Sequence, residues 1–511
     1  MTPFKAPIGD ILFSLVHVAD AARLDDWDAD VAGDVLAHFG TFAEGVIAPI
    51  NADGDLQGAR LENGRVCMPD GFQDAYRQLA EAGWQGLTAP EEHGGMAVSP
   101  LVAAGVSEIF CGANHALQMI CNLVPGAIAT LMRFGTPAQQ ADWIPRLASG
   151  EVLSTMCLTE PAAGSDLSAI RTRATRAGDV WRIDGEKIFI SGGDQDLSDD
   201  ILHLVLARTG DDGIRGLSLF LCPRQPGTKV TRIEEKMGLH ASPTCQMVFD
   251  GAEAELVGAE GEGLTAMFTL MNHARLDVAL QGVAHAARAA AIAAAYAGER
   301  RQGRRADGAP ANLSDHADIQ RMLDEQEVLA LTARAMCHIA LVEISAGADQ
   351  GLADFLTSLC KVYGSEAGPR AADLGMQIMG GYGYLTEYGM GQIWRDARIC
   401  AIYEGANGIH TKSLATRGLR PGGGADRFED LMMQLADGAL DSGVLNPWRQ
   451  LRDRLRGMDD PSPMAHEFYT ASAALFANAI WHKLRRVADH YHNPARLEAL
   501  ARRVLDGRKY A

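Results

Sequence analysis

The chain has 511 residues, several times what one hydrophobic core requires, so we expect two to four structural domains. Apolar residues make up 47% and charged residues 22%, a composition typical of a globular protein and neither disordered nor collagenous. The formal net charge of −19 argues against a nucleic acid or an anionic membrane as the main partner.

The first part of the chain has helical periodicity. Apolar residues at spacings of three and four predict helices over residues 31–46, 72–82, 101–111 and, with a break near Gly135 and Pro137, 128–147. The apolar run 11–19 follows Asp10 and contains His17, so we interpret it as a segment packed on the domain and not as a signal peptide. No stretch reaches roughly 18 uninterrupted apolar residues, and no integral membrane segment is expected. Residues 1–155 are therefore assigned to an N-terminal extension and an α-helical domain.

The pattern changes between residues 154 and 249. Short β-branched or aromatic runs separated by Gly, Asp and Pro predict a small β domain, which we place at 156–260. The expected strands cover residues 180–183, 187–190, 201–207, 217–222 and 246–249.

Long helical patterns return from residue 263 to 416, with 303–312 as an exposed loop, and predict a helical bundle over 261–420. Arg420 and Pro421 with the three glycines that follow are typical of a helix end and a flexible linker. We expect a domain boundary there, followed by an additional helical tail, 421–511. Its predicted helices cover residues 428–440, 448–458, 466–490 and 495–505.

Common chemical motifs are not found. The nine cysteines are scattered without a CxxC pair, which favours a reducing, cytoplasmic location. No HExxH motif or histidine ligand spacing is present, so no metal site is expected. No GxSxG motif occurs, and Gly380 and Gly381 follow a helical pattern where a Rossmann turn would follow a strand.

Three segments become specific when they are considered together: MCLTEPAAGSD at 156–166, QIMGGYG at 377–383, and WRDAR at 394–398 leading into IYEG at 402–405. Together they resemble the acyl-CoA dehydrogenase family, most of all its larger bacterial subfamily that includes 3-methylmercaptopropionyl-CoA and broad-range fatty acyl-CoA dehydrogenases. Matches at PEEHGG (90–95) and KMG (236–238) extend the resemblance over about residues 30–419. It implies an α+β fold: an N-terminal helical domain, a β-barrel-like middle domain and a C-terminal helical bundle, here with a helical tail.

The resemblance implies FAD as the cofactor. The loop 156–165 offers backbone amides and two hydroxyls, donors that suit a flavin edge and a diphosphate. Strand alternation would place Phe189 and Ser191 on one face, and in the family this face covers the flavin ring. Family positions that hold the diphosphate and adenosine half lie partly across a subunit interface, which implies a homodimer or homotetramer. By resemblance, the cofactor-binding residues are Met156, Leu158, Thr159, Ser165, Phe189, Ser191, Arg300, His316, Gln377, Gly380 and Gly381.

Three of these assignments have plainer alternatives. Gly380 and Gly381 lie at a helix-to-loop junction, where glycines most often just end the helix. The loop 156–165 by itself is also typical of an ordinary Ser/Gly turn. Arg300 lies in a basic run, 299–305, and most such runs are solvated faces.

Glu404 is the candidate catalytic residue. It lies between Ile402-Tyr403 and Gly405-Ala406, an apolar context that would desolvate a carboxylate and raise its pKa toward that of a working base. The alternative is a solvent-facing glutamate at a helix start. By resemblance, Glu404 removes the α-proton of the acyl thioester. The second base position known in the family is occupied by Ala274, which cannot act as a base. The implied substrate-binding residues are Ser165, Asn272, Arg275, Glu404 and Gly405.

The implied activity is FAD-dependent α,β-dehydrogenation of an acyl-CoA to a trans-2-enoyl-CoA, with electrons passed to electron-transferring flavoprotein. One alternative is an acyl-CoA oxidase on the same scaffold. Another is a non-catalytic acyl-CoA-binding or flavin-binding relative. This second alternative is motivated by Ala406, Gly408 and His410, which replace the Thr, Gln and Gln that commonly follow the catalytic Glu.

Overall fold

The computed structural model describes residues 2–178 and 180–506, without the side chains of residues 272 and 273. The chain forms two compact units. We call Gly45–Ser99 with Ala113–Ala274 the sheet unit, and Met1–Glu44, Pro100–Gly112 and Arg275–Ala511 the helical unit. The helices α5 (Pro100–Cys121) and α8 (Gly263–Glu299) contribute residues to both.

The helices of the sheet unit begin and end at clear sequence signals. For example, Thr136 and Gln139 form a capping box at the start of α7, and Gly150 ends it with a φ of +80°. The Tyr76 hydroxyl donates to the Gly150 carbonyl at 2.7 Å and so ties α4 to this end. The unit contains α3 (Asn51–Gln57), the hairpin β1 (Arg60–Glu62) and β2 (Arg65–Cys67), α4 (Phe72–Glu81), α6 (Val124–Phe134) and α7 (Pro137–Ser149).

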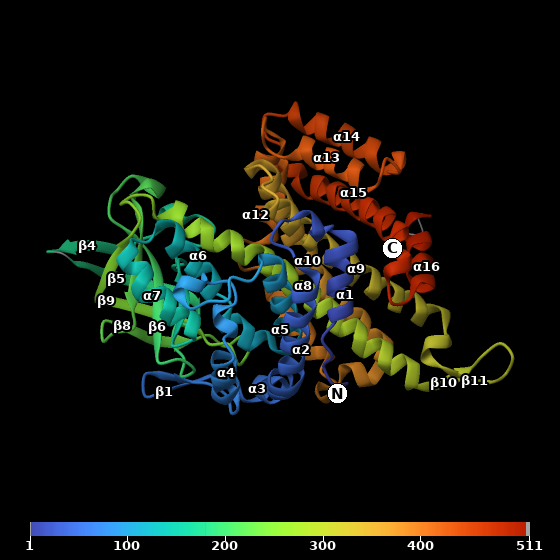
Figure 1. Cartoon of the computed structure of the whole chain (residues 1–511), viewed down its shortest axis with the longest axis horizontal. Helices are drawn as coiled ribbons and strands as arrows, with labels where there is room; N and C mark the ends of the chain where they lie inside the picture. Colours follow the sequence, from blue (N-terminus) through green and yellow to red (C-terminus); the bar gives the residue numbers. More distant parts are fainter. Residues whose placement is uncertain (1, 179, 507–511) are drawn as a thin grey trace. The chain divides into compact units, whose positions relative to one another are not determined.

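The seven-stranded sheet has the barrel-like form expected of the middle domain (Figure 1). Its strand order is β3-β6-β4-β5-β9-β7, and β6 also pairs with β7, so that five strands form a closed ring, while β8 pairs with β9. The strands are β3 (Val152–Cys157), β4 (Arg173–Ala177), β5 (Val180–Ser191), β6 (Asp200–Arg208), β7 (Leu217–Pro223), β8 (Thr228–Ile233) and β9 (Thr244–Val257).

The five expected runs correspond to four of these strands, β5, β6, β7 and β9, and the sequence pattern missed β3, β4 and β8. The expected strands 180–183 and 187–190 are one strand, β5, because Gly185 at φ +152° lets it continue through an irregularity in its pairing with β9.

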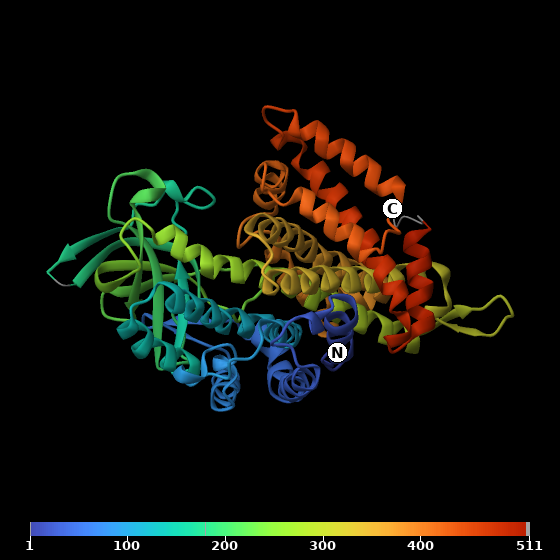
Figure 2. The ribbon, with the colours of Figure 1, turned by 45° about the horizontal axis from the view of Figure 1, so that its top comes forward.

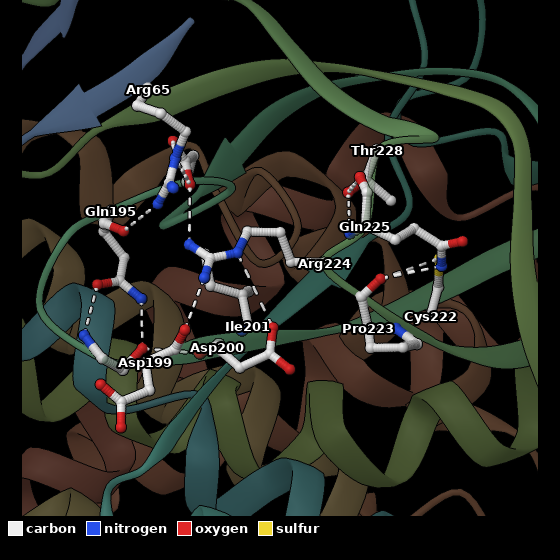
Figure 3. A network of polar contacts seen from close by, with 12 residues as sticks. Arg65, Gln195, Asp199, Asp200, Ile201, Cys222, Pro223, Arg224, Gln225 and Thr228 are labelled. Atoms are coloured by element: carbon white, nitrogen blue, oxygen red, sulfur yellow. Dashed lines mark hydrogen bonds and ion pairs between the residues drawn. The ribbon is translucent and has the colours of Figure 1, made fainter.

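A polar network holds the corner of the sheet beside β6 and β7 (Figure 3). The Arg224 guanidinium lies 3.8 Å from Asp194 and 3.9 Å from Asp200, and it donates to the Asp199 carbonyl at 2.6 Å. Arg65 on β2 donates to Asp194 at 2.8 Å. The network therefore joins the β1–β2 hairpin to the loop between β5 and β6.

The helical unit contains long helices packed closely. A Cβ atom on Gly282 of α8 would lie 1.9 Å from the Gly364 carbonyl oxygen of α10, so the two helices approach at a point that only glycine allows. The unit comprises α1 (Ile8–Phe13), α2 (Ala29–Phe42), α8 from Arg275, α9 (Ala317–Ser345), α10 (Gln350–Met379), α11 (Met390–Arg398), α12 (Asn407–Ala415), α13 (Ala425–Leu435), α14 (Ser442–Arg456), α15 (Ala465–Arg486) and α16 (Pro494–Leu505).

One expectation for this region was incomplete and one was wrong. The stretch 303–312 is largely exposed as expected, but it belongs to a short hairpin of β10 (Arg301–Arg304) and β11 (Pro310–Asn312). The expected flexible linker at 420–424 is a tightly packed turn, since a Cβ on Gly424 would lie 2.2 Å from the Gly351 carbonyl oxygen. The tail helices α13 and α15 pack on α10 and α12 within the same unit (Figure 2). The division of the chain at residues 155, 260 and 420 stays a prediction.

Three helical stretches are long and apolar enough to cross a membrane, judged by length and composition: Ala29–Gln57, Gly263–Glu299 and Ala317–Ser345. The bent pair Pro100–Cys121 and Val124–Phe134 would make a fourth. In the second and third stretches, 67% of the apolar window is buried inside the protein, as for core helices of a bundle. The expected absence of an integral membrane segment stays a prediction.

Candidate active site

Glu404 occupies a strained turn in the helical unit, between the short helix η12 (Ile399–Ala401) and α12. Its φ is +54°, and Gly405 follows at +89°. A positive φ at a non-glycine residue costs of the order of 1–3 kcal/mol and tends to occur at functional sites. A Cβ at position 405 would lie 2.8 Å from the His410 Nε2 atom, which explains the glycine.

Two buried side chains hold this turn by its carbonyl groups. The Lys361 ammonium group on α10 donates to the Gly405 carbonyl at 2.7 Å, and the His410 Nε2 atom on α12 lies 3.0 Å from the Glu404 carbonyl oxygen. Neither residue was identified as functional from the sequence. The available signal was a lysine inside the apolar helical run LCKV, residues 359–362.

The electrostatic environment of Glu404 is that of a desolvated acid. Burial raises the pKa of Glu404 to about 7, while the positive charges of Arg275 and Lys361 act in the opposite direction and Asp277 adds to the increase. Among the described residues, the buried Glu404 Oε2 atom has no hydrogen-bond partner. A carboxylate with one free acceptor oxygen and a pKa near neutrality can remove a proton from a bound molecule.

The side chain of Asn272, which was predicted to bind the substrate, lies outside the described residues.

In the sheet unit, a buried ion pair shapes the loop that follows β3. Lys187, with no exposed surface, lies 2.8 Å from the Glu160 carboxylate and donates to the Leu158 carbonyl at 2.9 Å. Glu160 also accepts from the backbone N–H groups of Arg171 and Thr172 at 2.7 and 3.1 Å. These contacts fix the backbone around Thr159, whose carbonyl accepts from the Ile188 N–H at 2.8 Å.

The structure therefore brings Leu158 and Thr159 beside the end of β5, where Phe189 lies. Phe189 has a φ of +59° and is 59% exposed, an unusual combination for a large aromatic residue. The pairing of β5 with β9 shifts between Lys187 and Ile190, and Ile190 is buried between the exposed Phe189 and the half-buried Ser191. That Phe189 and Ser191 share one face stays a prediction.

The remaining predicted cofactor residues of the sheet unit differ in how far they are exposed. Ser191 is half-buried and pairs with Thr244 of β9. Met156 is half-buried within β3, where the sequence suggested a loop, and Ser165 is exposed.

The other predicted cofactor residues form a second group in the helical unit, at the end of α10. Gln377, Gly380 and Gly381 are exposed there, and the Arg300 guanidinium lies 5.4 Å from the ring centre of Tyr382. His316 Nε2 lies 2.8 Å from the Gln302 carbonyl oxygen. Because a helix rises 1.5 Å per residue, Gly380 lies about 28 Å along α10 from Lys361. This group is therefore not part of the surroundings of Glu404 in the same chain.

Comparisons with known proteins cover most of the chain. Three family models match: "Acyl-CoA dehydrogenase, N-terminal domain" over residues 34–151, "middle domain" over 155–252 and "C-terminal domain" over 261–419.

Two relatives and one solved structure illustrate the similarity. The chain is 40% identical to 3-methylmercaptopropionyl-CoA dehydrogenase of Ruegeria pomeroyi over 86% of this chain and 80% of that protein. It is 33% identical to the broad-specificity linear acyl-CoA dehydrogenase FadE5 of Mycobacterium tuberculosis, over 82% of this chain and 75% of that protein. Caenorhabditis elegans ACDH-11, solved with C11-CoA, shares the fold at 19% identity with a TM-score of 0.81, over 98% of this chain and 91% of that one.

Proposed function

Because the chain belongs to the acyl-CoA dehydrogenase family of FAD-dependent oxidoreductases, we propose that it converts an acyl-CoA to a trans-2-enoyl-CoA with Glu404 as the base. The observation that carries this proposal is the Glu404 carboxylate itself: desolvated, with one unpartnered oxygen and a pKa of about 7. A solvent-facing glutamate at a helix start would have neither property.

The chain's residues have separate roles in the proposed reaction. Glu404 takes the α-proton, and the electron pair of that C–H bond forms the Cα=Cβ bond as the β-hydrogen leaves with its own pair. Arg275 lowers the pKa of Glu404 and so keeps a fraction of the base ionised near neutral pH. The backbone N–H of Glu404 is assigned to the thioester carbonyl, whose oxygen gains negative charge as the proton leaves. Ser165, Asn272 and Gly405 are assigned to binding of the acyl-CoA.

The residues of the sheet unit fit FAD. Phe189 offers an exposed aromatic face at a strained position, and the Lys187–Glu160 pair holds the neighbouring loop of Leu158 and Thr159 in place. An aromatic face beside backbone and hydroxyl donors suits the flavin ring. FAD supplies, when bound, the acceptor for the hydride that leaves the β-carbon. Met156, Ser165 and Ser191 complete this half of the proposed site.

We assign the adenosine half of FAD to Arg300, His316, Gln377, Gly380 and Gly381. Gln377, Gly380 and Gly381 lie at the far end of α10 from Lys361. The exposure of these three residues and of Arg300 favours a site completed by a second subunit. The proposed assembly is a homodimer or homotetramer in the cytoplasm.

Electron-transferring flavoprotein is the proposed acceptor, and an acyl-CoA oxidase on the same scaffold is the second candidate. The substrate is proposed to be a short or linear acyl-CoA, since the two relatives are named for 3-methylmercaptopropionyl-CoA and for linear acyl-CoAs.

The test is spectroscopic. The purified protein is expected to show a flavin absorption band that is bleached under anaerobic conditions by acyl-CoAs from a panel including 3-methylmercaptopropionyl-CoA, branched and long linear chains. Electron-transferring flavoprotein should then restore the band faster than oxygen, whereas rapid peroxide formation in air would favour the oxidase. A colourless protein that takes up no added FAD would contradict both.

A further inference from the structure

We propose that Lys361 is a positioning residue for Glu404: its ammonium group fixes the turn that carries the base and, together with Arg275, supplies positive charge that favours the ionised form of the base. His410 fixes the same turn without charge. This inference rests on the proposed function of Glu404 and adds two residues to its surroundings.

The geometry places Lys361 directly behind the turn. Its Nζ atom donates to the Gly405 carbonyl at 2.7 Å and to the Asn407 Oδ1 atom at 3.0 Å. The Ser365 hydroxyl, one helical turn further along α10, also donates to Asn407 Oδ1, at 3.2 Å. Both sides of Gly405 are thus anchored, because His410 contacts the preceding carbonyl and Lys361 contacts the carbonyl of Gly405 itself.

A positive charge at this place needs an explanation beyond hydrogen bonding. Lys361 has no exposed surface, both acceptors are neutral, and within the described part of the chain no ion pair holds its ammonium group. A buried charge without a counter-ion is costly, and a neutral donor could hold the turn equally well. Glu404 is one of the groups whose negative charge favours the protonated form of Lys361, and Lys361 in turn favours the ionised form of Glu404.

Several other groups act on this pair. From α8, Arg275 favours the ionised form of Glu404 and Asp277 opposes it. Lys361 is itself influenced by Glu366 of α10 and by Cys400. Arg275 is influenced in turn by Arg417 and Asp354. Burial lowers the pKa of Lys361 to about 8, so it remains mainly protonated at pH 7.

The proposed role of Lys361 has two parts, anchoring of the turn and a charge that acts on Glu404. His410 has only the first part, so a variant of His410 distinguishes them. Burial lowers the pKa of His410 to about 4, so the ring is neutral near pH 7 and must carry its proton on Nε2 to donate to the Glu404 carbonyl. Loss of His410 should disturb the turn and leave the charge on Glu404 unaffected, whereas loss of Lys361 should change both.

The experiment compares Lys361→Met, His410→Leu and Lys412→Met. The last variant is the matched control, because Lys412 is an exposed lysine on α12 and the substitution removes the same charge from a solvated position. The protonation midpoint of Glu404 is measured by infrared difference spectroscopy of the carboxyl band that disappears in Glu404→Gln. The rate of flavin reduction by a saturated acyl-CoA is measured in a single turnover from pH 5.5 to 9.

In Lys361→Met, both the infrared midpoint and the acid limb of the rate profile should move to higher pH by about one unit. This shift alone should lower the rate roughly fivefold at pH 7. At pH 9 the base is ionised again, so any remaining loss of rate would come from the altered turn. His410→Leu should lower the rate at every pH without moving the midpoint, and Lys412→Met should change neither.

An unchanged infrared midpoint in a folded, flavin-containing Lys361→Met protein would overturn the inference. If Lys361→Met does not fold, Lys361→Gln carries the same test, since its amide can still donate to the turn. If no acyl-CoA bleaches the wild-type flavin, the proposed function fails, while the infrared midpoint still decides the role of Lys361.

Discussion

Two residues of the proposed site, Phe189 and Glu404, have a positive φ, although neither is glycine. Phe189 lies at a shift in strand pairing, and Glu404 in a turn anchored by His410 and Lys361. Backbone strain of this kind persists only where the surrounding contacts impose it. The strain at both positions is therefore consistent with side chains that are oriented by the fold for binding and proton transfer.

The activity of Glu404→Gln tests the base directly. The amide keeps the size of the side chain and the backbone N–H but cannot take a proton, so FAD and acyl-CoA should still bind while flavin reduction slows at least ~10²-fold to 10⁴-fold. Single-turnover flavin reduction is the measurement. Glu387→Gln, at an exposed position in the loop after α10, serves as the control and should retain most of the rate. Near wild-type reduction by Glu404→Gln would place the base elsewhere.

The difference in stability between the wild type and Glu404→Gln should depend on pH. The pKa of Glu404 is about 7 in the folded protein and near 4.5 when the chain is unfolded, so the unfolded state releases this proton first. Folding stability contributed by this group therefore falls as pH rises from about 4.5 to 7. Glu404→Gln should have a higher Tm than the wild type, and the difference should grow over this pH range. Calorimetry of both proteins at pH 5 and 8 is the measurement, and a difference equal at both pH values would contradict the raised pKa.

Among the elements, α10 has two separate roles. Its middle holds the turn of Glu404 through Lys361, and its end presents Gln377, Gly380 and Gly381 at the surface. The tail also reaches this helix, because the Tyr469 hydroxyl of α15 donates to the Glu366 carboxylate at 3.4 Å and Glu366 accepts from Asn407 at 3.1 Å. The tail therefore supports the helix and the turn on which the proposed base depends.

The buried pair that shapes the loop after β3 leads to a prediction for the sheet unit. Lys187→Met leaves the Glu160 carboxylate buried without its cation and should lower the free energy of unfolding by about 3–5 kcal/mol. It should also weaken FAD retention, because the loop of Leu158 and Thr159 loses its anchor. Denaturant unfolding and the flavin-to-protein absorbance ratio are the measurements.

The double variant Lys187→Met with Glu160→Gln is the matched control and should be less destabilised than the single one, since no unpaired charge remains. Equal destabilisation of the two would show that the ion pair does not have this role.

For the whole molecule, the exposed group at the end of α10 predicts assembly. Light scattering should give a homodimer or homotetramer, because closed symmetric assemblies are the common outcome and the proposed adenosine site needs a second subunit. Gly381→Glu should lower FAD retention and leave the Glu404 infrared midpoint unchanged. A monomer that is saturated with FAD and active would refute the shared site.

The sequence by itself determined the kinds of element and pointed to the proposed base. Apolar periodicity predicted most of the helices, and five β-branched runs located strands of the sheet, since these patterns reflect which face of an element is buried. Motifs in order along the chain identified the family and Glu404.

Only the tertiary structure decided how Glu404 is held and what sets its charge. Lys361 and His410 are 43 residues before and six residues after the base, and no local pattern connects a lysine in one helix to a carbonyl in a distant turn. The shifted pairing at Phe189 and the packed turn at Gly424 likewise depend on contacts with distant backbone. Burial and electrostatic environment arise from the packing of elements that are far apart in the chain, and short-range sequence patterns do not contain that information.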